Sequence, residues 1–248
     1  MYTKGDFHIH TTKSDGDYTP TEIIMFAKES NVDTISITDH KTMSGVEEAI
    51  KAGEWLGVNV IPGIELSTRF NGKKVHILGY FTNEIYKDKD FISALRYAKK
   101  DNIKLLETLI GDDVDVRKDL EKNKITTQTG IDLLKYFGGS VVLAHPIRLK
   151  DGMLDPLLEM NFDGIEAIYP ENTVEQNELY KGIAREKGWV YTAGSDFHSD
   201  SKTHRHHGLI GQVYLNNYEI EKFTIKLKNN ENTCLGQACI NHQNSRQY

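Results

Sequence analysis

Short apolar segments alternate with amphipathic segments along the first eighty residues or so of the chain. Residues 34–38 alternate apolar and polar side chains with a period of two, which predicts a strand, and residues 58–64 form a second, more continuously apolar strand. Between residues 20 and 31, apolar side chains recur at helical spacing behind a Thr-Pro start, which predicts a helix. Residues 68–80 resemble a hairpin around an Asn-Gly turn. This alternation of strands and helices predicts an α/β fold.

The segment from about residue 82 to 139 breaks this alternation, because it is charged and helical in pattern. Its apolar residues Phe91, Leu95, Ala98, Leu105 and Leu109 fall near helical spacing, so the segment either lies over a site as a cap or packs against the wall of the fold.

After that segment the alternation resumes, with strands expected at 141–144, 164–168 and 190–193 and a further one at 209–215. Helices are expected at 175–187 and 218–227. Since no Pro- or Ser-rich linker divides the chain, we expect a single domain over residues 1–248, with the helical insertion at about 82–139 and a polar C-terminal tail at about 229–248.

Composition narrows the function classes. The chain has 248 residues, of which 38% are hydrophobic and 27% charged, as in soluble globular proteins, and it contains no apolar run long enough for a membrane span. The N-terminus carries no signal-like apolar stretch, so we expect a cytoplasmic protein without a membrane partner. Cys234 and Cys239 make no disulfide framework. The net charge of −6 argues against a broad nucleic-acid-binding surface. The oligomeric state stays open.

Histidines and carboxylates mark the chemistry. In an extended strand His8 and His10 project to the same side, and Asp15 follows in a turn that contains glycine, an arrangement that suits a divalent metal ion. Similar residues stand at the ends of other predicted strands. Because such ends meet on one face of a parallel α/β barrel, we expect a metal site there. The candidate ligands are His8, His10, Asp15, His40, Glu65, His76, His145, Asp196 and His198.

The segments that carry these residues resemble, in order, the motifs of the PHP (polymerase and histidinol phosphatase) family of metal-dependent phosphoesterases. The resemblance implies a distorted seven-stranded barrel of the (β/α)7 type, and it covers the chain from Asp6 to about His198. The matching segments are Asp6-Phe7-His8-Ile9-His10, Ser14-Asp15-Gly16, Ile37-Thr38-Asp39-His40, Gly63-Ile64-Glu65, His76-Ile77-Leu78-Gly79-Tyr80, Ala144-His145-Pro146 and Gly194-Ser195-Asp196-Phe197-His198.

The resemblance also implies up to three divalent metal ions. The first would be held by His8, His10, Glu65 and Asp196, the second by Glu65, His76 and His145, and the third by Asp15, His40 and His198. Zinc, manganese or iron would suit such ligands, and a bridging hydroxide would attack the phosphorus. Asp6 and Asp39 are candidates for fixing the imidazole tautomers of the ligands beside them.

Two arginines are candidate phosphate contacts. The segment His145-Pro146-Ile147-Arg148 resembles the His-Pro-x-Arg of the family branch that hydrolyses nucleoside 3′,5′-bisphosphates and trims short RNAs, which points to Arg148; Arg205 is the second candidate.

Three hypotheses therefore remain for the function. A phosphatase acting on a nucleoside 3′,5′-bisphosphate or on a small metabolite such as histidinol phosphate predicts a pocket closed by residues 82–139. A 5′–3′ exonuclease on short oligonucleotides predicts an open groove beside the metals. A non-catalytic, metal-dependent regulatory module predicts missing ligands.

Overall fold

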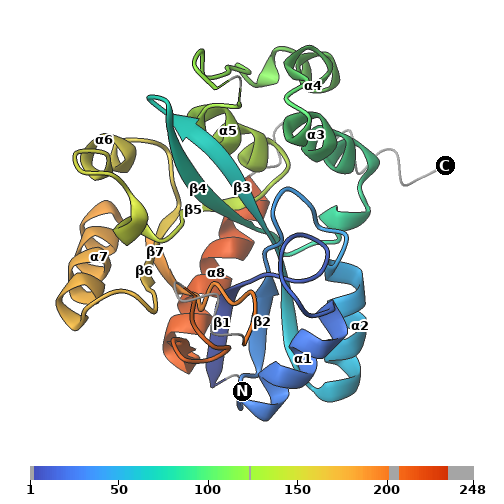
Figure 1. Ribbon diagram of the computed structural model, residues 1–248, viewed down its shortest axis with the longest axis vertical. Helices are drawn as coiled ribbons and strands as arrows, with labels where there is room; N and C mark the ends of the chain where they lie inside the picture. Colours follow the sequence, from blue (N-terminus) through green and yellow to red (C-terminus); the bar gives the residue numbers. More distant parts are fainter. Residues whose placement is uncertain (1–2, 123, 201–206, 234–248) are drawn as a thin grey trace.

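The computed structural model describes residues 3–122, 124–200 and 207–233. Within these ranges, eight strands form one sheet in the order β7-β6-β5-β4-β3-β2-β1-β8. The sheet curls so far that the end of β1 meets the chain after β7, where Ile9 and Phe197 form a parallel bridge (Figure 1). Strands β1 to β7 thereby make a nearly closed, seven-stranded barrel, and β8 adds to the outside of β1.

The strands are β1 (Lys4–Ile9), β2 (Thr34–Ile37), β3 (Asn59–Phe70), β4 (Lys73–Tyr80), β5 (Ser140–Leu143), β6 (Gly164–Ile168), β7 (Val190–Ala193) and β8 (Leu215–Asn216). Pairing is parallel except around β4, which is antiparallel to both β3 and β5, and between β1 and β8. The strand expected at 209–215 is reduced to β8.

The sequence predicts a strand at 58–64 and then a separate first arm of a hairpin. In the structure, β3 runs through both segments without a break. Its first part pairs with β2 as far as Pro62, and from Gly63 onward it pairs with β4. The change of partner takes place within one continuous strand. Glu65 therefore lies inside β3, two residues beyond the switch, rather than at a strand end.

The α-helices are α1 (Pro20–Glu29), α2 (Val46–Leu56), α3 (Lys89–Lys99), α4 (Ile103–Ile110), α5 (Thr127–Tyr136), α6 (Leu154–Leu158), α7 (Val174–Lys187) and α8 (Asn217–Thr233). Short 3-10 helices span η1 (Ile85–Lys87), η2 (Gly111–Asp113) and η3 (Pro146–Arg148). Helix α1 begins at the predicted Thr-Pro start, where Thr19 caps it in a capping box with Glu22. Helix α2 begins behind Gly45 and has no side-chain cap.

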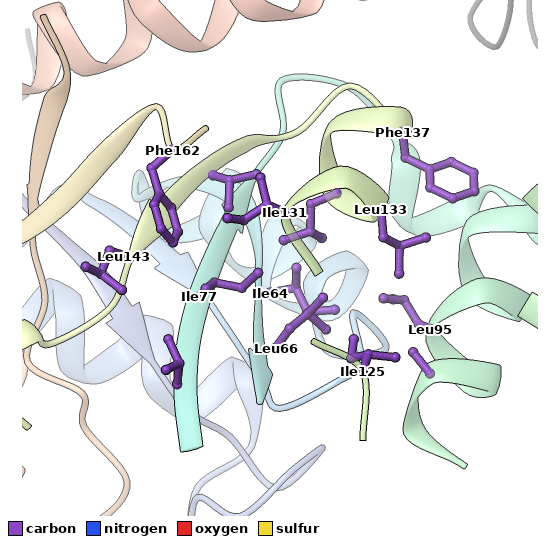
Figure 2. Packing of buried hydrophobic residues seen from close by; sticks show 14 of the residues in the cluster. Ile64, Leu66, Ile77, Leu95, Ile125, Ile131, Leu133, Phe137, Leu143 and Phe162 are labelled. Atoms are coloured by element: carbon purple, nitrogen blue, oxygen red, sulfur yellow. The ribbon is translucent and has the colours of Figure 1, made fainter. Parts of the chain in front are cut away.

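Helix α5 packs against the wall of the barrel at β3, β4 and β5, and α3 and α4 join the same apolar cluster. Ile64, Leu66 and Ile77 point from the outer face of β3 and β4 into a cluster with Leu95 of α3 and Leu133 of α5 (Figure 2). In α4 the buried residues are Leu106 and Ile110, whereas Leu105, an expected core position, is 43% exposed. Asn102 caps α4, so a new helix begins there, and the apolar spacing of α3 does not carry over into α4.

Helix α8 packs against the strands on another side of the barrel. The ring of Phe223 makes edge contacts with Phe7 and Tyr80, at centroid distances of 4.9 and 5.1 Å. The Tyr80 hydroxyl donates to the carbonyl of Phe7 at 2.8 Å. The expected polar tail thus begins as the end of α8, and its residues from 234 lie outside the described ranges. No helix in the described ranges is long and apolar enough to cross a membrane.

Candidate metal centre

The nine candidate ligands come from six strands and the loops after them, and the structure brings all of them together. His8 and His10 lie at the end of β1, Glu65 lies within β3 and His76 within β4. The other five follow strand ends: Asp15 in the loop after β1, His40 after β2, His145 after β5, and Asp196 and His198 after β7. The ligands meet at one site although part of the sheet is antiparallel, because Glu65 and His76 point inward from the two arms of the same hairpin.

The first group surrounds the tips of two imidazoles. Nε2 of His8 and Nε2 of His10 are 3.1 Å apart, and Oδ1 of Asp196 lies 3.3 and 3.2 Å from them. The Glu65 carboxylate closes the group, with Oε1 3.5 Å from His8 and Oε2 3.3 Å from His10. Four ligand residues from three segments thus face one point, the set that the family resemblance implies for the first metal.

The second group uses the same Glu65. Its Oε1 lies 2.7 Å from Nδ1 of His76 and 3.2 Å from Nε2 of His145, and these two nitrogens are 3.3 Å apart. Since Oε1 and Oε2 face different imidazoles, the single carboxylate of Glu65 can offer one oxygen to each of two cations. This is the geometry that a bridging ligand requires.

The third group is the most open to solvent. Asp15, with a half-exposed side chain, places Oδ2 3.6 Å from Nε2 of His40 and Oδ1 3.4 Å from Nε2 of His198. His40 also turns Nδ1 towards Glu65, at 2.9 Å. Nδ1 of His10 is 3.5 Å from Asp15 and so links this group to the first.

Several buried ligand atoms have no hydrogen bond. Nε2 of His76 is buried without a hydrogen-bond partner. Nδ1 of His10, Nδ1 of His40 and Oε2 of Glu65 lie close to atoms of other candidate ligands, but not in hydrogen-bond geometry. Burying such atoms unpaired costs free energy, and a cation would satisfy lone pairs that face a common point. The donor set of imidazoles and carboxylates suits zinc, manganese or iron. The residues present therefore fit a metal centre.

Burial and neighbouring charges shift the pKa values of the candidate ligands in different directions. Burial lowers the pKa of His10 to about 3 and that of His76 to about 4, which keeps both neutral, as a metal ligand must be. Burial acts in the same direction on His8, but the surrounding carboxylates, that of Glu166 first, outweigh it and raise the pKa. Burial alone would raise the pKa of Glu65, yet the imidazoles around it hold it well below its usual range.

A buried carboxylate that the sequence analysis did not single out supports the ligands. Glu166, in β6, is fully buried; its Oε1 lies 3.0 Å from Nδ1 of His8, and its Oε2 accepts the backbone N–H of His145 at 2.7 Å. Nδ1 of His198 lies 2.7 Å from the carbonyl oxygen of Asp196. In both histidines the contact at Nδ1 leaves Nε2 facing the centre. The sequence signal that points to Glu166 is an acidic residue within a predicted buried strand.

Asp6 and Asp39 do not contact the imidazoles of their neighbours, so the prediction that they fix those tautomers is wrong. Asp6 accepts the backbone N–H groups of Ser195 and Gly211, both at 3.0 Å. Asp39 accepts from the backbone and hydroxyl of Thr11 and from the hydroxyl of Ser14. Both carboxylates hold loops instead, because their side chains point away from the adjacent ligand. Asp39 thereby fixes the turn that presents Asp15.

Close backbone approach shapes the end of β7. A Cβ atom on Gly194 would lie 2.2 Å from Cβ of His8 and 2.3 Å from Oε1 of Glu166, so only glycine fits there. Asp196 and His145 both adopt positive φ, 54° and 25°. Such conformations are costly for these residue types and cluster at functional sites.

Of the two arginines predicted to contact phosphate, Arg148 lies within the described residues. Arg148 lies at the edge of the centre, where Nη1 donates to Oδ2 of Asp196 and Nε to Oε2 of Glu171, each at 3.1 Å. Its guanidinium lies 5.0 Å from the ring centroid of Tyr169, whose hydroxyl also donates to Asp196. Arg205 lies outside the described residues. His207, from the same histidine-rich segment, places Nδ1 3.0 Å from Asp196.

Comparison with known proteins identifies the family. The family model described as "PHP domain" matches residues 6–171, which is more than half of the chain. The chain belongs to the PHP family. This confirms the resemblance seen in the motifs, and the matched region contains the first seven of the nine candidate ligands. Asp196 and His198 lie beyond it.

Three relatives are enzymes that act on phosphate esters. A phosphoribosyl 1,2-cyclic phosphate 1,2-diphosphodiesterase from Eggerthella lenta is 28% identical over 78% of this chain and 93% of its own length. A 5′-3′ exoribonuclease from Haemophilus influenzae is 26% identical over 80% of this chain and 91% of its own length. A 3′,5′-nucleoside bisphosphate phosphatase from Chromobacterium violaceum is 36% identical, but over only 30% of this chain and 26% of its own length.

A solved structure of the PHP type agrees with the fold. The crystal structure of a protein from Bifidobacterium adolescentis, whose description names a metal-dependent phosphoesterase, covers 90% of this chain and 96% of its own with a TM-score of 0.68 and 23% identity. The predicted α/β barrel of the PHP type is thereby confirmed.

Proposed function

We propose that this chain hydrolyses a phosphate ester of a phosphorylated ribose or nucleotide, with up to three divalent metal ions held by the nine ligands described above. The observation that carries the proposal is the position of Glu65, whose two oxygens face different imidazole groups. A centre that had lost its activity would lack some of these ligands, and in this chain every position is filled. The alternative of a non-catalytic regulatory module is therefore less favoured.

Bound at this centre, divalent ions would lower the pKa of a coordinated water and neutralise the charge that builds up on the phosphoryl oxygens. The chain holds the ligands ready for them. Neutral His10 and His76 offer lone pairs at neutral pH, and Glu65 offsets positive charge. Glu166 holds His8 in orientation, and Tyr169 and Arg148 hold Oδ2 of Asp196, which directs Oδ1 to the first group.

A nucleoside 3′,5′-bisphosphate is the first candidate substrate. The three named relatives act on ribose derivatives, and one acts on such a bisphosphate. Arg148 stands beside Asp196, where its guanidinium could exchange Glu171 for a substrate phosphate.

A 5′–3′ exonuclease on short oligonucleotides is the second candidate. The phosphatase hypothesis predicts a pocket closed by residues 82–139. Of their helices, α5 packs on β3, β4 and β5, and α3 and α4 join its apolar cluster, which is the alternative of packing on the wall. Half-exposed Asp15 shows that the third ligand group reaches solvent. An accessible centre of this kind favours a substrate longer than one nucleotide.

The test is phosphate and nucleotide release from a panel of esters after loading with Mn²⁺, Zn²⁺ or Fe²⁺. The panel contains adenosine 3′,5′-bisphosphate, histidinol phosphate, a phosphoribosyl cyclic phosphate and a 5′-phosphorylated oligoribonucleotide. Metal-dependent release from a ribose derivative supports the proposal and chooses among its substrates. A metal-loaded protein that releases nothing from any member would overturn it.

A further inference from the structure

A row of basic side chains continues from the candidate metal centre along the hairpin of β3 and β4. Alternate residues of a strand share a face, so Arg69 points to the same side as Glu65. Across the hairpin, Lys74 pairs with Arg69, two residues from His76 in β4. Opposite residues of an antiparallel pair lie on the same face. This pair of cations therefore extends the face that carries the predicted ligands Glu65 and His76.

Three more lysines border the same region. Lys41 directly follows His40, and its backbone N–H donates to the carbonyl of Glu65 at 2.9 Å. Lys41 and Lys99 line one hollow. Lys124 precedes Ile125, whose carbonyl accepts the backbone N–H of Arg69 at 3.0 Å. We call this set the basic strip. It consists of Lys41, Arg69, Lys74, Lys99 and Lys124.

The positive charge of the basic strip is only partly compensated. Of its acidic neighbours, Asp101 forms an ion pair with Lys124, and Asp119 accepts the backbone N–H of Gly72 at 2.9 Å. The remaining four cations have no carboxylate within ion-pair distance among the residues that the structure describes. Nε of Arg69 is buried without a hydrogen-bond partner. A chain of net charge −6 thus keeps a local excess of positive charge beside its metal centre.

A hollow lies next to Lys41, between the loop after β2 and helix α3. It has a volume of about 220 Å³, and three cations line it: Lys41, Arg96 and Lys99. The rest of its wall consists of three apolar residues, Tyr86 and the two small polar residues Thr42 and Ser44. The hollow offers cations and an apolar wall within one space, as a phosphorylated nucleoside requires.

We propose that the basic strip binds a second phosphate group of the substrate, one that is not hydrolysed. This inference rests on the proposed function and makes it more specific, because it requires a substrate with at least two phosphate groups. Arg69 and Lys74 lie at roughly 7–14 Å along the strands from the predicted ligands, at about 3.4 Å per residue, which leaves room for a sugar between the two phosphates. The second phosphate is either that of a nucleoside bisphosphate or the next internucleotide phosphate of an oligonucleotide.

The test compares two pairs of exposed lysines in the Mn²⁺-loaded, full-length protein. The double variant K74A/K99A removes two members of the basic strip. The matched control K73A/K100A removes their sequence neighbours, of which Lys73 lies on the opposite face of β4. Both variants lose the same charge, so a difference between them reports position rather than net charge. R69Q is a third variant, and thermal unfolding is measured for all of them.

Adenosine 3′,5′-bisphosphate, the dinucleotide pApA and adenosine 5′-monophosphate are compared. KM is measured where hydrolysis occurs, and the calorimetric Kd where it does not. We expect K74A/K99A to weaken binding of the bisphosphate, the dinucleotide or both about tenfold, with no change for the monophosphate. We expect no such change in K73A/K100A. An effect on the bisphosphate alone identifies a free second phosphate, and an effect on the dinucleotide identifies the internucleotide one.

Equal affinities of K74A/K99A, R69Q and the wild type for both two-phosphate compounds would overturn the inference. So would equal losses for the monophosphate and the bisphosphate. If the wild type hydrolyses none of the panel, the proposed function fails, whereas the Kd values still decide whether the basic strip binds a second phosphate.

Discussion

The Glu166 carboxylate and the His8 imidazole form a fully buried pair, with Oε1 3.0 Å from Nδ1. The second oxygen of Glu166 accepts the backbone N–H of His145. One side chain of β6 thus supports ligands from two other parts of the barrel, one through its ring and one through its main chain. Contacts of this kind fix the tautomer and the orientation of a metal-binding imidazole.

Replacing Glu166 with Gln should weaken metal binding about 10–100-fold, because the amide carries no charge to hold the Nδ1 proton of His8. The substitution preserves size and one hydrogen bond, so the barrel should fold normally. The measurement is calorimetric titration of the metal-free protein with Mn²⁺, with circular dichroism to confirm the fold. Glu175→Gln, on the exposed first turn of α7, serves as the control. Unchanged Mn²⁺ affinity in Glu166→Gln would remove this carboxylate from the support of the centre.

The candidate ligands could be predicted because each carries a local signal. His8 and His10 alternate with Phe7 and Ile9 at the end of one strand, and His40 lies three residues beyond the end of another. Strand ends converge in any α/β barrel, so the position along the chain was sufficient to group these residues.

Features that depend on pairing between distant segments were not predictable. Glu166 is one carboxylate in a short strand. The pairing of β6 with β5 gives it His145 as a partner, and the closure of the barrel, which brings β1 near, gives it His8. The alignment of Lys74 with Arg69 depends on the register of β3 and β4. The phase of α4 depends on a cap at Asn102 that breaks the apolar spacing. Local pattern carries none of this information.

His8→Ala or Glu65→Ala should abolish hydrolysis, because each removes a ligand atom from the first group and Glu65 also faces the second. Loss of activity should exceed a factor of about 100, since the ligands act as a unit. Turnover is measured with saturating metal, and thermal unfolding reports the fold. Glu54→Ala, on the exposed face of α2, is the control. Wild-type turnover in a variant that carries both substitutions, measured under full metal supplementation, would contradict the proposed mechanism.

Arg148→Ala should raise KM for phosphorylated substrates about tenfold or more while kcat changes less, because a charged donor to the phosphate is lost. Arg148 also contacts Asp196, so the same variant tests whether the arginine acts on the substrate or only through this ligand. If Arg148 only positions Asp196, Mn²⁺ affinity falls and KM at saturating metal stays unchanged. Arg148→Lys keeps the charge but not the two-pronged geometry, so it should restore KM only in part. An unchanged KM would exclude a substrate contact.

Metal binding should release protons and should weaken as the pH falls below neutral. The pKa values of His8, His40 and His198 are raised, because nearby carboxylates outweigh the effect of burial, so these groups keep their protons to higher pH than free imidazoles do, and a cation must displace those protons. His10 and His76, with pKa values of about 3 and about 4, are already neutral and release none. Calorimetry of Mn²⁺ binding at pH 7 in two buffers of different ionisation enthalpy counts the protons, and Glu166→Gln should lower the count, since it removes the charge that holds the proton on His8. Binding enthalpies that do not depend on the buffer would show that the histidines are neutral before the metal arrives.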